Sequence, residues 1–166
     1  LGFGMKAGLF PMHVWLPEAH PAAPSHVSAI MSGVMIKTGV YGVLRVVSQM
    51  SDPAQIHTAG VVILGAGVVT GLWGVILAAM QNDVKRLLAY SSIENVGVIF
   101  IGLGIATLAN AAGNATIMNL ALCGALLHTI NHSFFKSMLF FGAGNIYSQM
   151  HTTLLDRFGG VAKHMP

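Results

Sequence analysis

The stretch from Thr58 to Met80 contains no ionisable side chain, and it is long enough to cross a membrane as a helix. A hydrocarbon core about 30 Å thick needs roughly 20 apolar residues, each rising about 1.5 Å along the helix axis. Comparable apolar stretches, the first of them incomplete, occupy about residues 1–15, 25–47, 87–108 and 116–147. The pattern predicts an all-α, polytopic transmembrane helical bundle with about five membrane helices.

Composition supports this fold class. Apolar residues make up 54% of the chain and charged residues only 8%, whereas an ordinary soluble domain carries roughly 25% charged residues. These charges are too few to cover a soluble surface. The chain starts inside an apolar run and lacks the pattern of a signal peptide. We therefore interpret residues 1–166 as a single partial transmembrane domain that is truncated at both ends.

Polar segments connect the predicted spans. The connection over residues 16–25 contains three prolines, which should prevent a continuous helix there. A turn over residues 48–57 precedes the third span. Asp83 is placed to begin the fourth helix, close to the positive end of its dipole.

The distribution of Lys and Arg over the short loops predicts the orientation, since cytoplasmic loops carry an excess of these residues. In an alternating topology only Arg45 falls on one side of the membrane. The other side holds Lys85, Arg86, Arg157 and Lys163. That side is therefore predicted to be cytoplasmic, in a multi-pass protein of the cell (inner) membrane.

Lys37 lies near the middle of the second span, where insertion scales give a cost of about 2.5–3.5 kcal/mol for a lysine. It is too far from either end of the span for its ammonium to reach the membrane surface comfortably. Such a residue normally faces the interior of a bundle or a water-filled cavity. Either Lys37 only forms hydrogen bonds to neighbouring carbonyls, or it accepts and releases protons. We favour the second interpretation.

His128, His132 and Lys136 recur at intervals of four residues in the fifth span. On a helix they lie on one face, about 6 Å apart along the axis. Histidine titrates near neutral pH and can both accept and donate a proton, so this face suits a proton relay with ordered water between the side chains. The alternative is a metal or haem site, but no glutamate lies between the histidines and no third ligand is obvious.

Lys6 and Glu94 are further candidates for the relay. Lys6 lies close to Gly8 and Pro11, where a helix break beside a water-filled cavity would explain a lysine at membrane depth. The alternative is a lysine near the end of a span whose ammonium reaches the membrane surface. Glu94 is the only acidic residue inside the predicted spans. It either pairs with a lysine or is a solvated residue at the level of the lipid headgroups.

Other ionisable residues near the ends of the spans have simpler explanations. Lys85 and Arg86 are either anchors at the cytoplasmic surface of the membrane or groups of the proton path, and we favour the first interpretation. His13, His20 and His26 surround the prolines of the first connection, where they either line a vestibule or are only solvated.

No cofactor or metal site is predicted. Cys123 is the only cysteine, which excludes a disulfide framework and a cysteine-ligated cluster, and we interpret it as a small packing residue. There is no dinucleotide fingerprint or phosphate loop, and the eight Lys and Arg residues form no basic patch for nucleic acid. Any enzyme activity would belong to an assembly, since this chain offers no catalytic residue.

Three segments resemble one family of membrane proteins. They are residues 6–20 (KAGLFPMHVWLPEAH), residues 83–91 (DVKRLLAYS) and the His128, His132 and Lys136 series. They look like the signatures of the antiporter-like subunits of complex I, of multisubunit sodium/proton antiporters and of group 4 hydrogenases. Within the family, residues 20–37 and 91–95 (SSIEN) look most like the hydrogenase branch, represented by hydrogenase-4 component B and the large membrane subunit of formate hydrogenlyase.

The resemblance implies a fold of two inverted five-helix repeats, each with one broken helix. Lys6 would be the lysine of the first broken helix and Lys37 a connecting lysine on the next helix. The central relay face would be formed by His128, His132 and Lys136. A glutamate that pairs with the first lysine, and the second broken helix, would lie outside residues 1–166. Glu94 departs from the usual quinone-reductase pattern.

The sequence therefore predicts a proton-translocating membrane subunit of a respiratory or hydrogenase oxidoreductase complex, related to NADH:quinone oxidoreductase. Its expected partners are other membrane and peripheral subunits, the lipid bilayer, and protons or, in their place, sodium ions. One alternative is a subunit of a multisubunit cation/proton antiporter without redox partners. Another is a subunit retained for assembly alone.

Overall fold

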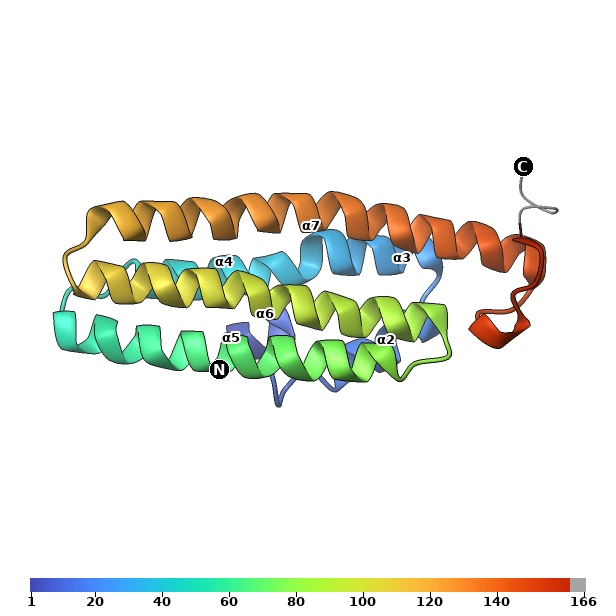
Figure 1. Ribbon diagram of the computed structural model, residues 1–166, viewed down its shortest axis with the longest axis horizontal. Coiled ribbons are helices and arrows are strands. Elements are labelled where there is room, and N and C mark those ends of the chain that lie inside the picture. The colour runs from blue at the N-terminus through green and yellow to red at the C-terminus, as the bar shows by residue number, and fades with distance from the viewer. Residues whose placement is uncertain (162–166) are drawn as a thin grey trace.

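The computed structural model describes residues 1–161 as a bundle of helices, with no strand among them beyond an isolated bridge. The long helices lie side by side in an elongated bundle, and two short helices from the start of the chain lie along it (Figure 1). The helices are α1 (Gly2–Ala7), α2 (Trp15–Ala22), α3 (Ser25–Ile30), α4 (Ile36–Val47), α5 (Pro53–Ala79), α6 (Val84–Ala111) and α7 (Ala115–Met150). A π-helical turn, η1 (Met31–Met35), joins α3 to α4, and a 3-10 turn, η2 (Leu155–Arg157), follows α7.

Within the described residues, three helices are long and apolar enough to cross a membrane: Ser25–Val47, Pro53–Ala79 and Val84–Ala111. The first of these is continuous through α3, η1 and α4. Helix α7 has 36 residues and is therefore about 54 Å long, well beyond the thickness of a hydrocarbon core. It must tilt or extend past the membrane surface.

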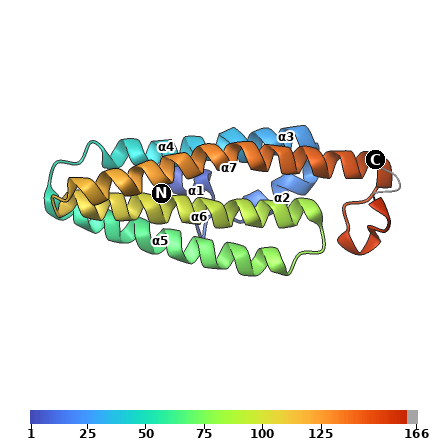
Figure 2. The same cartoon turned by 45° about the horizontal axis from the view of Figure 1, so that its top comes forward.

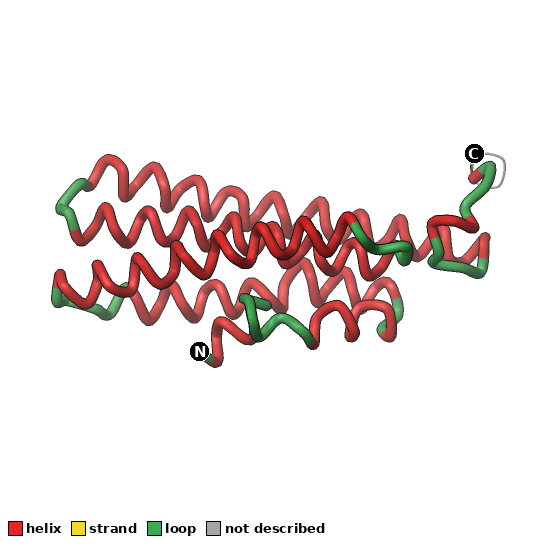
Figure 3. The backbone as a smooth tube through the Cα atoms, turned by 60° about the horizontal axis from the view of Figure 1, so that its bottom comes forward, coloured by secondary structure: helices red, strands yellow, loops and turns green. Residues whose placement is uncertain are grey.

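The first predicted span is a broken helix. Helix α1 ends where Gly8 adopts a left-handed conformation with a φ of 86°, and irregular backbone follows until α2 begins at Trp15. Figure 3 shows this connection as a loop on the outside of the bundle. The break lies where the sequence predicts it.

As predicted, no continuous helix runs over residues 16–25, but the interruption is limited to Ala23 and Pro24, because α2 contains Pro17 and Pro21. Pro17 lies in the first turn of α2, where a missing N–H group costs no hydrogen bond. Pro21 lies in the last turn. The backbone becomes extended only at Ala23, directly before Pro24, as the steric restriction on a residue before proline requires.

Helix α5 begins earlier than the sequence predicts, because the turn after α4 ends at Asp52. The Asp52 carboxylate caps the helix by accepting a hydrogen bond of 3.1 Å from the Ala54 N–H, and Pro53 fits the first helical position. Asp83 caps α6 in the predicted way, accepting a bond of 2.9 Å from the Arg86 N–H.

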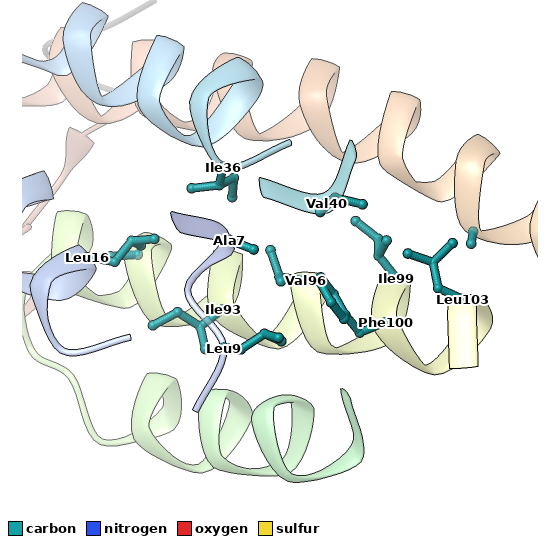
Figure 4. Close-up of a cluster of buried hydrophobic side chains, with 12 residues drawn as sticks. Ala7, Leu9, Leu16, Ile36, Val40, Ile93, Val96, Ile99, Phe100 and Leu103 are labelled. Atoms are coloured by element: carbon teal, nitrogen blue, oxygen red, sulfur yellow. The ribbon is translucent and has the colours of Figure 1, made fainter. Parts of the chain in front are cut away.

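Buried apolar side chains fill the space between α1, α4 and α6 (Figure 4). Ile93, Ile99 and Phe100 of α6 are almost fully buried, in the same cluster as Ile36 and Val40 of α4. This core fixes α6 at the centre of the bundle, and α5 and α7 pack on it.

The loops with basic residues gather at one end of the bundle. The turn between α5 and α6 lies beside the segment that follows α7, joined by a bridge between Asp83 and Leu154 and by a hydrogen bond of 2.9 Å from the Val84 N–H to the Thr153 carbonyl (Figure 2). The end of α4, which carries Arg45, lies at the opposite end. Lys163, which also enters the orientation argument, lies outside the described residues.

Candidate functional site

Lys37 and His132 meet in the interior of the bundle. Lys37 lies in the first turn of α4, and its ammonium contacts Nδ1 of His132, at the middle of α7. The same ammonium donates a hydrogen bond to the main-chain carbonyl of Ser32, within the π-helical turn η1. Turns of this kind are rare and occur often at functional sites. The chain thus brings together two basic groups that are 95 positions apart.

Helix α6 supplies polar groups that contact η1 and Lys136 of α7. The hydroxyls of Ser32 and Ser92 form a hydrogen bond of 2.8 Å, and Ser92 also donates to the Leu88 carbonyl at 2.8 Å. Lys136 Nζ donates to the same Leu88 carbonyl at 3.3 Å. His132 and Lys136 are 0% and 1% exposed, so the packed helices enclose both basic side chains completely.

His128 extends the series by one turn of α7. Its ring centroid lies 6.4 Å from that of His132, and its Nε2 lies 3.0 Å from the Asn95 side-chain oxygen. The Asn95 amide in turn donates to the Ser91 carbonyl at 2.8 Å. Three titratable side chains of α7 therefore lie on its inner face, each in contact with α6 or Lys37.

The family described as "NADH:quinone oxidoreductase/Mrp antiporter, TM" matches residues 1–166. The chain belongs to this family. Hydrogenase-4 component B of Escherichia coli K12 is 45% identical, with 99% of this chain and 25% of the relative covered. Formate hydrogenlyase subunit 3 of the same organism is 37% identical, with 100% and 27% covered. The chain thus spans about a quarter of the length of these relatives.

A solved structure has the same fold. A chain of the membrane-bound sulfane sulfur reductase, an archaeal respiratory membrane complex, is 27% identical and superposes with a TM-score of 0.84, with 99% of this chain and 32% of that chain covered. The comparisons confirm the predicted family, its likeness to the hydrogenase branch, and the all-α membrane bundle.

Two of the predicted relay residues, Lys6 and Glu94, form no hydrogen bond with Lys37 or His132 in the described part of the chain. Lys6 is exposed in the last turn of α1, and among the described residues its ammonium forms no hydrogen bond or ion pair. Glu94 is half-buried and accepts a hydrogen bond of 3.4 Å from the Ser91 hydroxyl. Among the described residues its carboxylate forms no hydrogen bond to His128 or Lys136. The roles of both residues stay predictions.

His20 is a buried titratable residue. The sequence predicted only that it lines a vestibule or is exposed to solvent. Its ring is 0% exposed, stacks on Phe140 of α7 with centroids 4.6 Å apart, and has no protein hydrogen-bond partner at either nitrogen within residues 1–161. The error follows from treating its segment as a loop. In a helix, Leu16 and His20 are one turn apart, and both are buried on the inner face of α2.

The metal or haem alternative receives no support from the geometry. Across residues 1–161, no three His, Cys, Asp or Glu side chains come close enough together to hold a metal ion. His128 contacts an asparagine and His132 contacts a lysine, which is a poor environment for a cation. The arrangement suits proton exchange between neighbouring bases.

Proposed function

We propose that this chain forms a section of a proton-conducting path in a membrane subunit of a hydrogenase- or quinone-reductase-type complex of the cell (inner) membrane. The observation that carries the proposal is the contact between the half-buried Lys37 ammonium and Nδ1 of the fully buried His132. When Lys37 is protonated it can pass the proton along this hydrogen bond. The transfer leaves a neutral amine on Lys37 and a doubly protonated ring on His132.

The next transfer starts from the other nitrogen of His132. His132 Nε2 is buried and has no protein partner among the described residues, whereas buried polar atoms are normally hydrogen-bonded. A water molecule at this nitrogen would connect the ring with its neighbours on α7. His128 lies one turn before His132 on this helix, and Lys136 lies one turn after it. The proposed relay comprises Lys37, His128, His132 and Lys136, with Lys6 and Glu94 as flanking members.

Repulsion between the basic groups would help the proton to move on. Two positive charges about 7 Å apart, at an effective dielectric constant of about 20, repel by roughly 2.4 kcal/mol. Protonation of one member of the relay therefore favours release from the next. The ion is a proton in this proposal, because nitrogen bases fix protons, and the enclosed groups include no cluster of oxygen anions that would suit sodium.

The relatives suggest the partners. Hydrogenase-4 component B and formate hydrogenlyase subunit 3 are named as parts of multisubunit enzymes, and the sulfane sulfur reductase is a respiratory membrane complex. We infer that electron transfer belongs to other subunits, and that this chain contributes to proton movement across the membrane.

Proton uptake by vesicles that contain the full-length subunit in its complex tests this function. Lys37→Met and Lys136→Met should each reduce proton uptake to background, because a thioether cannot bind or pass a proton. Arg45→Met is the matched control, since Arg45 is exposed near the end of the same helix as Lys37. Normal uptake by both lysine variants would contradict the proposal.

The family also includes antiporters, which favours one alternative: a cation/proton antiporter subunit without redox partners. The two functions differ in what drives proton movement. Uptake that requires oxidation of an electron donor such as hydrogen or formate, or reduction of a quinone, supports the redox-linked complex. Uptake driven by an imposed sodium gradient in the absence of any reductant supports the antiporter.

A further inference from the structure

A second polar site lies at the end of the bundle that carries the basic loops. It is a pocket of about 360 Å³ between the start of α3, the first turn of α6 and the last turns of α7. Its polar and aromatic lining comes from Ser25, His26, Lys85, Phe141, Asn145 and Tyr147. None of the residues that line it is acidic.

Lys85 brings a positive charge into this pocket without an anion to balance it. Its side chain was interpreted from the sequence as a surface anchor, yet it is only 7% exposed. Its ammonium donates one hydrogen bond of 2.9 Å to the Ala23 carbonyl and lies 5.8 Å from the centre of the Tyr147 ring. Among the described residues the one ion pair joins Arg86 to Glu18. A buried cation is costly unless it is paired, so the Lys85 ammonium is suited to an external anion.

The pocket offers further donors and acceptors beside that charge. The Ser25 hydroxyl, the Asn145 amide and the His26 ring can each donate a hydrogen bond to an oxyanion. A tetrahedral phosphate group needs several donors of this kind around one cation. The lining therefore matches a phosphate.

The position of the pocket along the bundle favours the phosphate of a lipid headgroup over a free phosphate ion. Tyr147 is half exposed near the end of α7, and tyrosine is enriched where membrane and water meet. Phe141 is also half exposed and lies six residues earlier, about 9 Å deeper along the helix. A polar pocket at headgroup depth with an exposed aromatic ring below it fits a lipid, whose acyl chain can lie on Phe141.

We propose that this pocket binds the phosphate headgroup of an anionic phospholipid, with Lys85 as its cationic partner and Phe141 in contact with an acyl chain. An anionic lipid is favoured over a zwitterionic one because the lining carries a positive charge and no carboxylate to pair with a choline or ethanolamine group. Basic pockets between helices at the cytoplasmic side of a membrane are known to bind anionic headgroups. The proposal does not depend on the proton relay.

Native mass spectrometry of the full-length protein in its complex tests the site, with phosphatidylglycerol titrated into a detergent that replaces bound lipid. Phosphatidylcholine and inorganic phosphate are titrated in parallel. We expect phosphatidylglycerol to bind more tightly than phosphatidylcholine, and Lys85→Gln to weaken its binding about fivefold, the usual effect of one basic residue near a membrane surface. Arg45→Gln, a change of the same kind at the opposite end of the bundle, should leave the affinity unchanged.

Three results would overturn the proposal: an unchanged affinity in Lys85→Gln, equal binding of the two lipids, or displacement of phosphatidylglycerol by an equal concentration of inorganic phosphate. If the Lys85→Gln protein does not assemble into its complex, the Asn145→Ala variant tests the site instead. It removes one donor and keeps the charge, and should weaken phosphatidylglycerol binding several-fold, as expected for a hydrogen bond to a charged group. An assembled Asn145→Ala complex with normal affinity would also overturn the site.

Discussion

The two sides of α6 are packed by different means. Towards α5, the helices meet backbone to backbone: a Cβ at Gly97 would lie 2.4 Å from Gly71 N, and one at Gly74 would lie 2.6 Å from Glu94 N. Towards α7, the same helix presents polar groups, and the enclosed His132 and Lys136 lie opposite them.

This contrast follows from the membrane environment. Apolar side chains gain little by leaving lipid, so helices without polar groups associate through close backbone contact between small residues. Titratable side chains need hydrogen-bond partners and space, so glycine contacts cannot hold them. Helix α6 can therefore act as a rigid support on one side and as a source of polar partners on the other.

The largest effect should come from replacing the central base on the polar side. His132→Gln keeps a side chain that forms hydrogen bonds but cannot carry an extra proton, so proton uptake should fall by about 100-fold or more, the usual contribution of a positioned acid–base group. His57→Gln on α5, where the histidine is exposed, is the control and should behave like the unmodified protein. Uptake is measured in vesicles and divided by the amount of assembled complex. A fall of less than about twofold would remove His132 from the relay.

The next largest effect should come from the glycine contact. Gly97→Ala places a methyl group against the backbone of Gly71, which must move, and should destabilise the fold by about 1–3 kcal/mol. Gly65→Ala is the control, because a Cβ there meets nothing within 4 Å. Unfolding in mixed detergent measures both. Equal stability of the two variants would contradict the close approach, and loss of proton uptake in molecules that remain folded would show that the two sides of α6 are not independent.

The sequence predicted the membrane helices and the basic face of α7, but not the contacts that join distant segments. A run without charges predicts a membrane helix, and four-residue spacing puts His128, His132 and Lys136 on one face, because both arguments depend only on helix geometry. The contact between Lys37 and His132 joins distant segments, and no local pattern specifies it. The π-helical turn before Lys37 and the burial of His20 were also missed. A π-helical turn has no simple sequence signature. The burial of His20 was missed because Pro17 and Pro21 suggested a loop, although both prolines fit near the ends of the short helix α2.

A smaller effect is expected at the hydroxyl pair that links α6 to η1. Ser92→Ala removes the bond to Ser32 and leaves that buried hydroxyl without its partner, which should cost about 0.5–1.5 kcal/mol in stability. Ser48→Ala is the control, because the Ser48 hydroxyl also donates to a carbonyl, that of Arg45, but is exposed to solvent. The same unfolding measurement applies. If Ser92→Ala is no less stable than Ser48→Ala, the hydroxyl pair does not hold the helices together.

Replacing Glu94 should change proton uptake least. This residue lies between the α5 side and the α7 side of α6. Its main-chain nitrogen lies close to Gly74 of α5, while its carboxylate accepts a hydrogen bond from Ser91. Glu94→Gln removes the charge and keeps that acceptor oxygen. Because the carboxylate is half-buried and forms no hydrogen bond to His128 or Lys136 among the described residues, proton uptake should fall by no more than about threefold, as expected for a partly screened charge. Glu18→Gln, which removes the charge of an exposed ion pair, is the control. A loss in Glu94→Gln as large as that in His132→Gln would mean that the proton path crosses α6 at Glu94, so that the glycine-packed side borders the path as well.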